Sequence, residues 1–222
     1  MKVKIISHSQ APMEDSLHKL SALDLIAYCA RVSNPDNQLN TETSEKLIKY
    51  LIKNAHWSPL EMVSACLEIE TTRDIARQIL RHRSFSFQEF SQRYANPVKD
   101  LEFVTREARL QDLKNRQNSI ETDDEEITNM WIKKQEDLIE NAKETYNWAI
   151  KNGIAKEQAR AVLPEGNTVS RLYANGTLRS WIHYIELRSA NGTQKEHMDL
   201  AIAIAEAITA IFPLSEQYIT KE

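Results

Sequence analysis

Alternation of apolar and polar residues predicts strands in four stretches of the chain. Residues 1–7 set valine and isoleucine against lysine, and residues 63–69 set apolar side chains against mainly polar neighbours. A period of two sends successive side chains to opposite faces of a sheet, so each stretch is expected to bury one face. Shorter extended segments are predicted after Arg83 and from Leu101 to Thr105.

An apolar period near 3.6 predicts that helices make up much of the remaining chain. The longest helix follows a capping-box pattern from Thr122 to Glu125 and stops at Asn152-Gly153. The polar residues 106–124 are predicted to be loop or a short helix, and Asn175-Gly176 is taken as the start signal of a later helix. The predicted helices cover approximately residues 21–32, 44–54, 73–83, 125–152, 156–163, 178–188 and 194–212.

Composition places the chain among ordinary globular proteins. Of its 222 residues, 41% are hydrophobic and 27% are charged, and the 4 Gly and 6 Pro favour long helices with few tight turns. This length can bury a sizeable core, and we expect a single domain spanning residues 1–222. The formal net charge of -4 argues against a general nucleic-acid binder, which would be basic.

Cysteine usage and the amino-terminal residues indicate a reducing, cytoplasmic compartment. Cys29 and Cys66 are the only cysteines, and neither lies in a cluster with metal-ligand spacing. We therefore expect neither a disulfide framework nor a metal site. The first ten residues lack the apolar stretch of a signal peptide, and no run approaches 18 apolar residues, so no membrane span is expected.

Positive charge is concentrated between Thr71 and Tyr94, although the chain as a whole is acidic. Five arginines stand there against two acids. Guanidinium groups repel one another unless an anion compensates them, and their planar forks suit phosphate oxygens, so a phosphate-bearing ligand is the first hypothesis. The arginines are Arg73, Arg77, Arg81, Arg83 and Arg93.

Two other interpretations of this stretch stay open at this point. The triplet Arg81-His82-Arg83 is also typical of a solvated helix end, where cations are favoured by the helix dipole. Four aromatic side chains could stack on bases, as in a single-stranded nucleic-acid binder, although alternating phenylalanines are more often core. The aromatic residues are Phe85, Phe87, Phe90 and Tyr94.

Glycine-based nucleotide motifs are missing from the sequence. The four glycines lie far apart, so neither G-x-G-x-x-G nor a P-loop can be formed. There is also no G-x-S-x-G and no H-E-x-x-H. A nucleotide would have to be held by side chains, and the arginine-rich stretch offers them.

Residues 81–91, RHRSFSFQEFS, resemble the signature of the flavin-dependent thymidylate synthases, which is RHR, seven residues, Ser. Gln92-Arg93-Tyr94 follow, as is typical of that family. ARQILRHR leads into the signature, and further segments are similar to family segments in family order. They are CARVSNP (29–35), HWSPLE (56–61), ARAVLP (159–164) and LRSWIHYIELR (178–188).

The resemblance implies an α/β (α+β) fold in which long helices flank a central, mostly antiparallel sheet. It also implies a homotetramer, assembled through helices and the active-site region, with active sites shared between subunits. The implied reaction methylates deoxyuridylate (dUMP) to thymidylate (dTMP). Methylenetetrahydrofolate would donate the carbon, and FAD reduced by NADPH would supply the hydride. The resemblance implies no metal, no membrane and no nucleic-acid partner.

Individual site residues are implied by matching positions. The implied FAD contacts are His56, Ser58, Arg81, His82, Arg83, Glu89, Thr177, Arg179 and His183. The implied dUMP contacts, several of them across a subunit boundary, are Gln78, Arg81, Glu89, Phe90, Ser91, Gln92, Arg93, Arg160 and Arg188.

Arg188 matches the arginine that activates the uracil ring. A guanidinium stays protonated and cannot act as a base, but it can stabilise an anionic ring and so raise electron density at carbon 5. Hydride transfer belongs to the flavin, and no protein nucleophile is required. Three positions depart from the family pattern: Gln88 replaces an Asn of many members, and Thr177 and Gly192 stand where some relatives have Asn and His.

Two rival functions remain after this comparison. The first is a single-stranded nucleic-acid-binding protein that uses residues 71–94, and the second is a flavoprotein of the same fold with a different nucleotide substrate. The acidic net charge and the separate segments that carry Arg160 and Arg188 weigh against the first.

Overall fold

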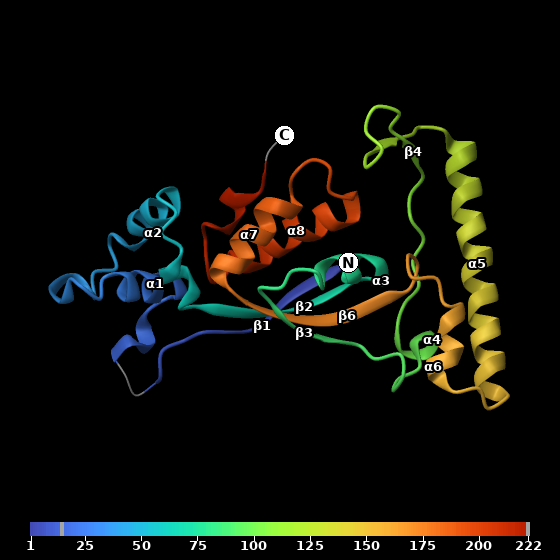
Figure 1. Ribbon diagram of the computed structural model, residues 1–222, viewed down its shortest axis with the longest axis horizontal. Helices are drawn as coiled ribbons and strands as arrows, with labels where there is room; N and C mark the ends of the chain where they lie inside the picture. The colour runs from blue at the N-terminus through green and yellow to red at the C-terminus, as the bar shows by residue number, and fades with distance from the viewer. Residues whose placement is uncertain (14–15, 221–222) are drawn as a thin grey trace.

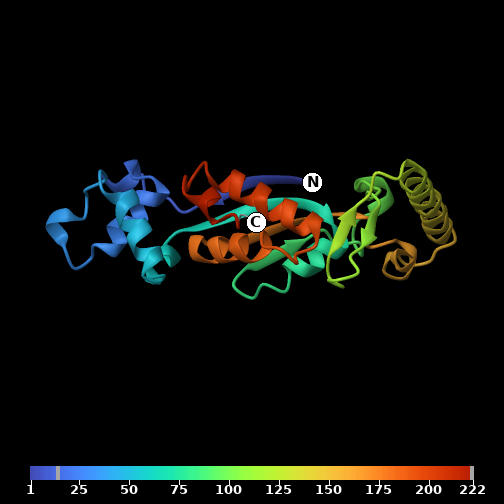
Figure 2. The ribbon, with the colours of Figure 1, turned by 90° about the horizontal axis from the view of Figure 1, so that it is seen from above.

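A four-stranded antiparallel sheet forms the centre of the protein in a computed structural model that describes residues 1–13 and 16–220. The strand order is β1-β2-β6-β3. The molecule is elongated, and helices extend it beyond both ends of the sheet (Figure 1, Figure 2). The strands of this sheet are β1 (Lys2–His8), β2 (Ser64–Thr72), β3 (Ser86–Glu89) and β6 (Val169–Thr177).

The pairing of β2 with β6 extends over nine residues, from Ser64 opposite Thr177 to Thr72 opposite Val169. β6 was not among the predicted strands. Its inward positions hold Ser, Leu, Ala and Gly in turn, so its buried side shows little apolar periodicity. Asn175-Gly176, interpreted as a helix start, lies inside this strand, and the helix begins only at Leu178.

Two helices pack on one face of the sheet and supply much of the core (Figure 1). They are α7 (Leu178–Arg188) and α8 (Lys195–Ile208). The indole of Trp181 is buried and donates to the backbone oxygen of Ala65 at 3.1 Å, which fixes α7 to β2. The predicted end of the last helix near Phe212 is wrong, since the helix ends at Ile208 and turns follow.

Helix α3 (Arg73–Ile79) follows β2 without a break. The predicted extension of this helix to Arg83 is wrong, because turns begin after Ile79. The chain then becomes extended, as predicted, and forms β3. Between the two, the Phe85 ring packs on Trp181 with 4.5 Å between ring centroids and occupies the space above Gly176.

The two ends of the molecule are helical. One end holds α1 (Ala22–Ala30) and α2 (Ser44–Lys53), and the other holds α4 (Pro97–Asp100), α5 (Glu125–Lys151) and α6 (Lys156–Ala159). Short 3-10 helices cover Ser16–Lys19, Pro35–Asn37, Ser58–Glu61, Arg160–Val162 and Ser215–Tyr218. Among the helices of residues 1–13 and 16–220, none combines the length and apolar character that crossing a membrane requires.

The polar segment before α5 is a hairpin, so its prediction as loop or short helix is wrong. β4 (Arg109–Gln111) pairs with β5 (Ser119–Glu121) in antiparallel fashion. Asp112 orders the turn by accepting from the backbone nitrogen of Lys114 at 2.7 Å and of Asn115 at 3.1 Å. Such side-chain turns, between strands of three residues, leave almost no periodic signal in the sequence.

The structure corrects the N-cap of α5, although the helix begins at Glu125 as predicted. Asp124, rather than Thr122, caps the helix, since its carboxylate accepts from the Ile127 nitrogen at 3.0 Å. The predicted stop is confirmed, with Asn152 as the C-cap and Gly153 at φ +80°. That conformation strains residues other than glycine, which explains why the helix ends there.

Replacing Gly176 with alanine is expected to lower the free energy of unfolding by about 1–3 kcal/mol, because the new methyl group would collide with the Phe85 ring. Chemical denaturation measures this change. The matched control is Gly166→Ala, where a methyl group would meet no atom within 4 Å, and its effect should stay within about 0.5 kcal/mol. Equal losses in the two variants would contradict the prediction.

Candidate functional site

Arg188 and His82 meet at the centre of the candidate site. The Nε of Arg188 donates to Nε2 of His82 at 2.9 Å. Because Nε2 accepts this bond, the ring carries its proton on Nδ1 and is neutral. Burial, together with the charges of Arg188 and Arg81, lowers the pKa of His82 to about 4. The histidine therefore orients the guanidinium without adding a charge.

Arg188 differs from several other arginines of the protein in having no acidic partner among the described residues. Arg179 pairs with Glu61 at 2.5 Å, and Arg93 pairs with an acid of its own. No carboxylate of the described residues forms an ion pair with Arg188, although its side chain is partly buried. A partly buried cation whose neighbours are neutral is suited to an anionic ligand.

A second layer of polar side chains lies behind Arg188. The hydroxyl of Tyr184 lies 2.9 Å from Nε2 of His197, and Nδ1 of the same ring lies 3.1 Å from Oε1 of Gln78. Burial, followed by the charges of Arg188 and His82, lowers the pKa of His197 to about 3. Burial also raises the pKa of the Tyr184 hydroxyl. Both side chains are thus uncharged at neutral pH.

Glu89 joins the edge strand β3 to the arginine-rich helix. Its carboxylate accepts from Ser170 at 2.8 Å and pairs with Arg73 at 3.3 Å and Arg77 at 3.4 Å. Arg73 is nearly fully buried, so this pairing offsets the cost of enclosing its charge. Glu89 therefore has a structural role within its own subunit, in addition to the ligand contacts that the resemblance implies.

A second group of expected FAD residues lies around the first turn of α7. The ring of His183 packs on Trp57 with 4.5 Å between centroids, and Thr177 caps the helix by accepting from the Ser180 nitrogen at 3.3 Å. Arg179 is nine residues from Arg188, which corresponds to about 13 Å along a helix. The other members of this group, His56 and Ser58, lie in the segment that leads to β2.

A third group of expected residues lies after β3 and just after α6. Arg93 pairs with Glu157 of α6 at 3.4 Å, and the Ser91 hydroxyl accepts from the Arg93 nitrogen at 3.4 Å. The amide nitrogen of Gln92 is buried and has no hydrogen-bond partner among the described residues. Buried donors are normally satisfied, so this amide is a candidate for a ligand or water contact. Phe90 and Arg160 complete the group.

The structure thus brings only part of the expected site together within one chain. Gln78, His82 and Arg188 form the central group, whereas the other two groups stand at separate places. Arg81 and Arg83 are exposed and form no ion pair in the described part of the chain.

Sequence reasoning missed His197 and Tyr184. Tyr184 lies among the buried residues of α7, and His197 lies in the first turn of a helix whose remainder is rich in alanine and isoleucine. The only available signal was the polar run from Gln194 to His197 at the start of α8.

Two of the four aromatic side chains considered for base stacking belong to the core. Phe85 and Phe87 are partly buried and pack against the main hydrophobic cluster. This packing confirms the interpretation of alternating phenylalanines as core. Tyr94 is 84% exposed, so it stays available to a ligand or to another subunit.

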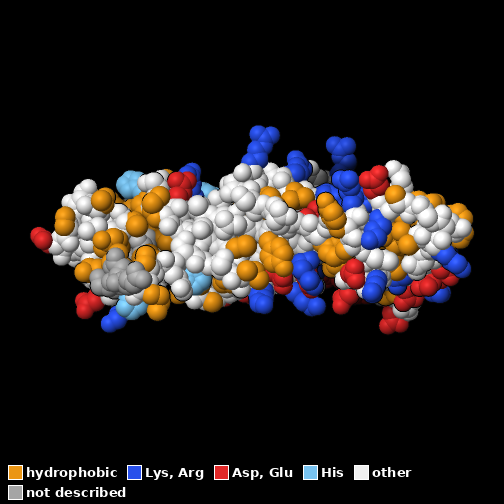
Figure 3. Space-filling model, turned by 90° about the horizontal axis from the view of Figure 1, so that it is seen from below, with side chains coloured by type: hydrophobic (Ala, Val, Ile, Leu, Met, Phe, Trp, Pro, Cys, Tyr) orange, Lys and Arg blue, Asp and Glu red, His pale blue; other side chains and the backbone are white. Residues whose placement is uncertain are grey.

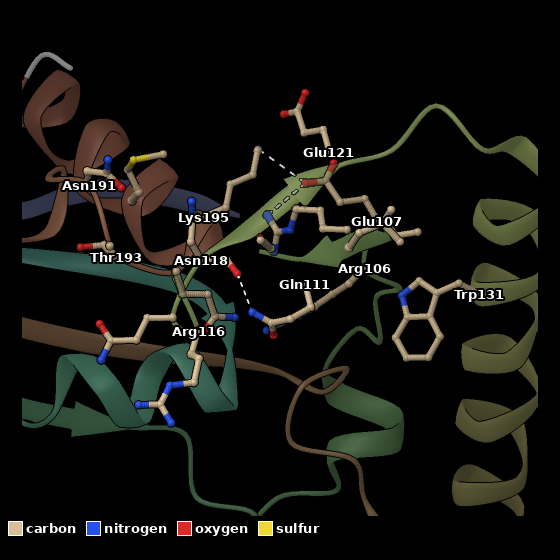
Figure 4. Close-up of a pocket in the computed structure, with 18 of the residues that line it drawn as sticks. Arg106, Glu107, Gln111, Arg116, Asn118, Glu121, Trp131, Asn191, Thr193 and Lys195 are labelled. Atoms are coloured by element: carbon tan, nitrogen blue, oxygen red, sulfur yellow. Dashed lines mark hydrogen bonds and ion pairs between the residues drawn. The ribbon is translucent and has the colours of Figure 1, made fainter. Parts of the chain in front are cut away.

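A cavity of about 890 Å³ lies beside the β4–β5 hairpin (Figure 4). Its walls come from the β4–β5 hairpin, the start of α5 and the connection between α7 and α8. Arg116 extends from the hairpin, and the indole of Trp131 faces the space from α5. Gln194 lines the cavity and also accepts from the amide of Gln78 at 2.9 Å, so the cavity is connected to the central group by a hydrogen bond.

Comparison with known proteins identifies the family. Residues 17–214 match the family described as Thymidylate synthase complementing protein (Thy1). The chain belongs to this family. It is 49% identical over 213 residues to the probable flavin-dependent thymidylate synthase of Paramecium bursaria Chlorella virus 1, a match that covers 96% of each protein. It is 48% identical to the flavin-dependent thymidylate synthase of Synechocystis sp., again with 96% of each covered.

A solved structure with a similar fold is the UMP/dUMP methylase PolB from Streptomyces cacaoi, bound with 5-Br dUMP. The TM-score is 0.79 at 26% identity, with 98% of this chain and 93% of that chain covered. These findings confirm the predicted family, enzyme class and mixed helix and antiparallel-sheet fold. The roles assigned to individual residues stay predictions.

Acidification is expected to destabilise the protein through its two buried histidines. Their pKa values in the folded state are about 4 and about 3, against an ordinary value of 6.5. As pH falls below 6.5, the unfolded chain therefore binds protons that the folded chain does not, and stability declines. Above 6.5 the full stability is present.

His197→Asn should reduce the pH dependence of unfolding, because one of these protons is lost. Denaturant unfolding of wild type and variant, measured at intervals between pH 7.5 and 4.5, gives the two slopes. The slope of unfolding free energy against pH should be smaller in the variant, by an amount that corresponds to at most one bound proton. Identical slopes would show that His197 does not contribute.

Proposed function

We propose that this protein makes dTMP by reductive methylation of dUMP, with methylenetetrahydrofolate as carbon donor and NADPH-reduced FAD as hydride source. Family membership supports the reaction class. The observation that carries the assignment to this site is Arg188, a partly buried guanidinium whose contacts are neutral and which has no carboxylate partner among the described residues. Such a group suits a ligand that becomes anionic during the reaction.

In this proposal Arg188 binds the uracil ring. Its Nε is engaged by His82, so the plane of the guanidinium is set and the two terminal nitrogens remain for the ligand. The positive charge stabilises negative charge on the ring as carbon 5 becomes nucleophilic. The neutrality of His82 matters here, because a second cation would repel Arg188 and a carboxylate would neutralise it.

The side chains present are suited to FAD. Arg81 and Arg83 are exposed cations without an acidic partner in the described residues, which fits a pyrophosphate. With His82 and Glu89 they would hold the cofactor together with the group at the start of α7. When bound and reduced by NADPH, FAD supplies the hydride. The members of the group at the start of α7 are His56, Ser58, Thr177, Arg179 and His183.

We further propose a homotetramer of single-domain subunits, 1–222, with shared active sites. The separation of the three groups on one chain supports this, because Ser91, Gln92, Arg93 and Arg160 would then hold the phosphate of a dUMP seated on a neighbouring subunit. Exposed apolar side chains are available for the contact. On α5, Leu138 is 52% exposed, and the face in Figure 3 has apolar side chains at both ends of the molecule. The free cysteines fit a cytoplasmic location.

The proposed reaction predicts a yellow protein whose flavin bands bleach when NADPH is added. Failure to bind FAD even when it is supplied would favour the single-stranded nucleic-acid rival. Release of tritium from dUMP labelled at carbon 5, dependent on the folate and NADPH, would distinguish the enzyme from a flavoprotein that uses another nucleotide. Absence of this release from flavin-loaded protein would contradict the proposed substrate.

Arg188→Ala is expected to reduce tritium release by at least about a hundredfold, because the charge that stabilises the anionic ring is lost. The flavin spectrum should persist in this variant. The matched control is Arg171→Ala, which removes an exposed arginine of β6 that pairs with Glu70 at 2.5 Å. The control should keep its activity, and undiminished turnover of Arg188→Ala would refute the assigned role.

Shared active sites can be tested by mixing two inactive variants. Arg188→Ala and Arg93→Ala would each disable every site of a uniform oligomer. After random mixing of equal amounts, about a quarter of the sites should combine two intact halves and recover activity. Co-expression with two affinity tags, followed by tritium release, measures the recovery. No recovery in isolated mixed oligomers would place both residues in a site within one subunit.

A further inference from the structure

Five side chains form a continuous chain of hydrogen bonds from α8 to the central group. Glu196 accepts from Nε2 of Gln194 at 2.9 Å, and Oε1 of Gln194 accepts from Nε2 of Gln78 at 2.9 Å. Oε1 of Gln78 lies 3.1 Å from Nδ1 of His197, and Nε2 of His197 lies 2.9 Å from the Tyr184 hydroxyl. Each member bonds to the next through polar atoms of its side chain.

The polarity of this chain is determined at its Glu196 end. A carboxylate only accepts, so Gln194 must turn its amide nitrogen to Glu196 and its oxygen to Gln78. Gln78 must then give its nitrogen to Gln194 and its oxygen to the histidine. His197 must carry its proton on Nδ1, and its bare Nε2 accepts from the Tyr184 hydroxyl. Reversing any one amide would set two acceptors or two donors against each other.

Glu196 is held in its charged form by hydrogen bonds and by two arginines. Burial alone would raise its pKa. Its own backbone amide, the amide of Gln194 and the charges of Arg106 and Arg109 outweigh that effect, so the pKa lies below its ordinary value. Arg106 lies 3.7 Å from the carboxylate, and Arg109 also pairs with it. Both arginines belong to the segment that enters and forms the β4–β5 hairpin.

We propose that Glu196 is a positioning residue that acts through this chain to lock the Gln78 amide, so that Gln78 offers an N–H donor to an acceptor oxygen of the nucleotide. The proposal rests on the proposed function, because it takes dUMP as the ligand. One hydrogen of the Gln78 amide nitrogen goes to Gln194, and the second is left for the ligand.

The acceptor oxygen can belong to the uracil ring or to the phosphate. Uracil presents carbonyl oxygens, whereas cytosine presents an amino group at carbon 4. A locked donor would favour a ring carbonyl and oppose that amino group, so it would select dUMP over deoxycytidylate. If the oxygen belongs to the phosphate, the locked amide would instead favour dUMP over deoxyuridine. In both cases the Gln78 amide donates to an oxygen of dUMP. A ring contact changes the preference over deoxycytidylate, and a phosphate contact changes the preference over deoxyuridine.

Glu196→Gln is the decisive variant. It keeps the size of the side chain but can present either an oxygen or a nitrogen to Gln194, so the polarity of the chain is no longer fixed. Glu107→Gln is the matched control, since Glu107 pairs with Arg109 at 3.1 Å and with Lys195 at 3.8 Å but makes no contact with the chain. Both variants lose one carboxylate of the same arginine.

Binding to the flavin-loaded enzyme is measured by titration calorimetry, without turnover. The ligands are dUMP, deoxycytidylate and deoxyuridine. In Glu196→Gln the affinity for dUMP should fall about five- to tenfold, the effect of one lost or misdirected hydrogen bond. If the ring is the acceptor, the ratio of the affinities for dUMP and deoxycytidylate should fall by a similar factor. If the phosphate is the acceptor, the ratio for dUMP and deoxyuridine should fall instead. Glu107→Gln should keep wild-type ratios.

A second pair of variants tests the other end of the chain. His197→Asn keeps a donor close to the position of Nδ1, whereas His197→Leu removes it. The asparagine variant should therefore retain more of the nucleotide preference than the leucine variant does. If His197 had only a structural role, the loss of preference in each variant would simply parallel its loss of thermal stability. Flavin content and melting temperature of each variant show whether it is folded. This pair keeps the proposal testable if Glu196→Gln does not fold.

The possible results separate the two proposals. If the wild-type holoenzyme does not bind dUMP, the proposed function fails. If it binds dUMP and both preferences are unchanged in folded Glu196→Gln, or change equally in Glu107→Gln, the positioning role of Glu196 is overturned. Equal nucleotide preferences in the asparagine and leucine variants of His197 would also overturn it.

Discussion

The nine-residue antiparallel ladder between β2 and β6 is the constraint on which the site depends. Each strand leads directly into a helix, α3 after Thr72 and α7 after Thr177. Because the strands are antiparallel, these helices start at opposite ends of the sheet and run toward each other. The turn after α3 therefore meets the last turn of α7, and His82 contacts Arg188. A shift of one residue in the ladder would turn the buried face of β6 to solvent and separate this pair.

The second constraint is electrostatic. Arg73, which is buried, is paired with carboxylates, whereas Arg188 bonds to the neutral His82 and lies near Tyr184 and His197, which are also uncharged. Enclosing an unpaired cation costs free energy, and the cost falls when an anion binds. In the proposed function, binding of an anionic ligand would offset this cost at Arg188, and functional sites commonly depart from the rules of stable packing in this way.

Much of the fold could be predicted from the sequence because most elements have a strong period or a clear boundary. The first strand, the strand before α3 and the long helix up to Gly153 are examples. β6 could not be predicted, since its inward side holds three small residues and one leucine. One of the small residues, Gly176, leaves room for the Phe85 ring, and a residue that fits a ring distant in sequence carries no local signal. The signature points to His82 and the resemblance of residues 178–188 points to Arg188, but the contact between the two depends on strand pairing across about a hundred residues of sequence.

The signature also leaves out residues that lie away from the expected ligand contacts. Some of these residues connect the helical end that carries α5 to the central group. Arg106 is held by Asp74 at 2.7 Å and, through its backbone, by the buried amide of Gln135 on α5 at 2.9 Å. That anchoring brings its charge to Glu196, which in turn determines how the amides of Gln194 and Gln78 must point. In this proposal α5, which carries none of the expected ligand contacts, influences which hydrogen-bonding groups the site presents, and the positions involved cannot be recognised until the chain is folded.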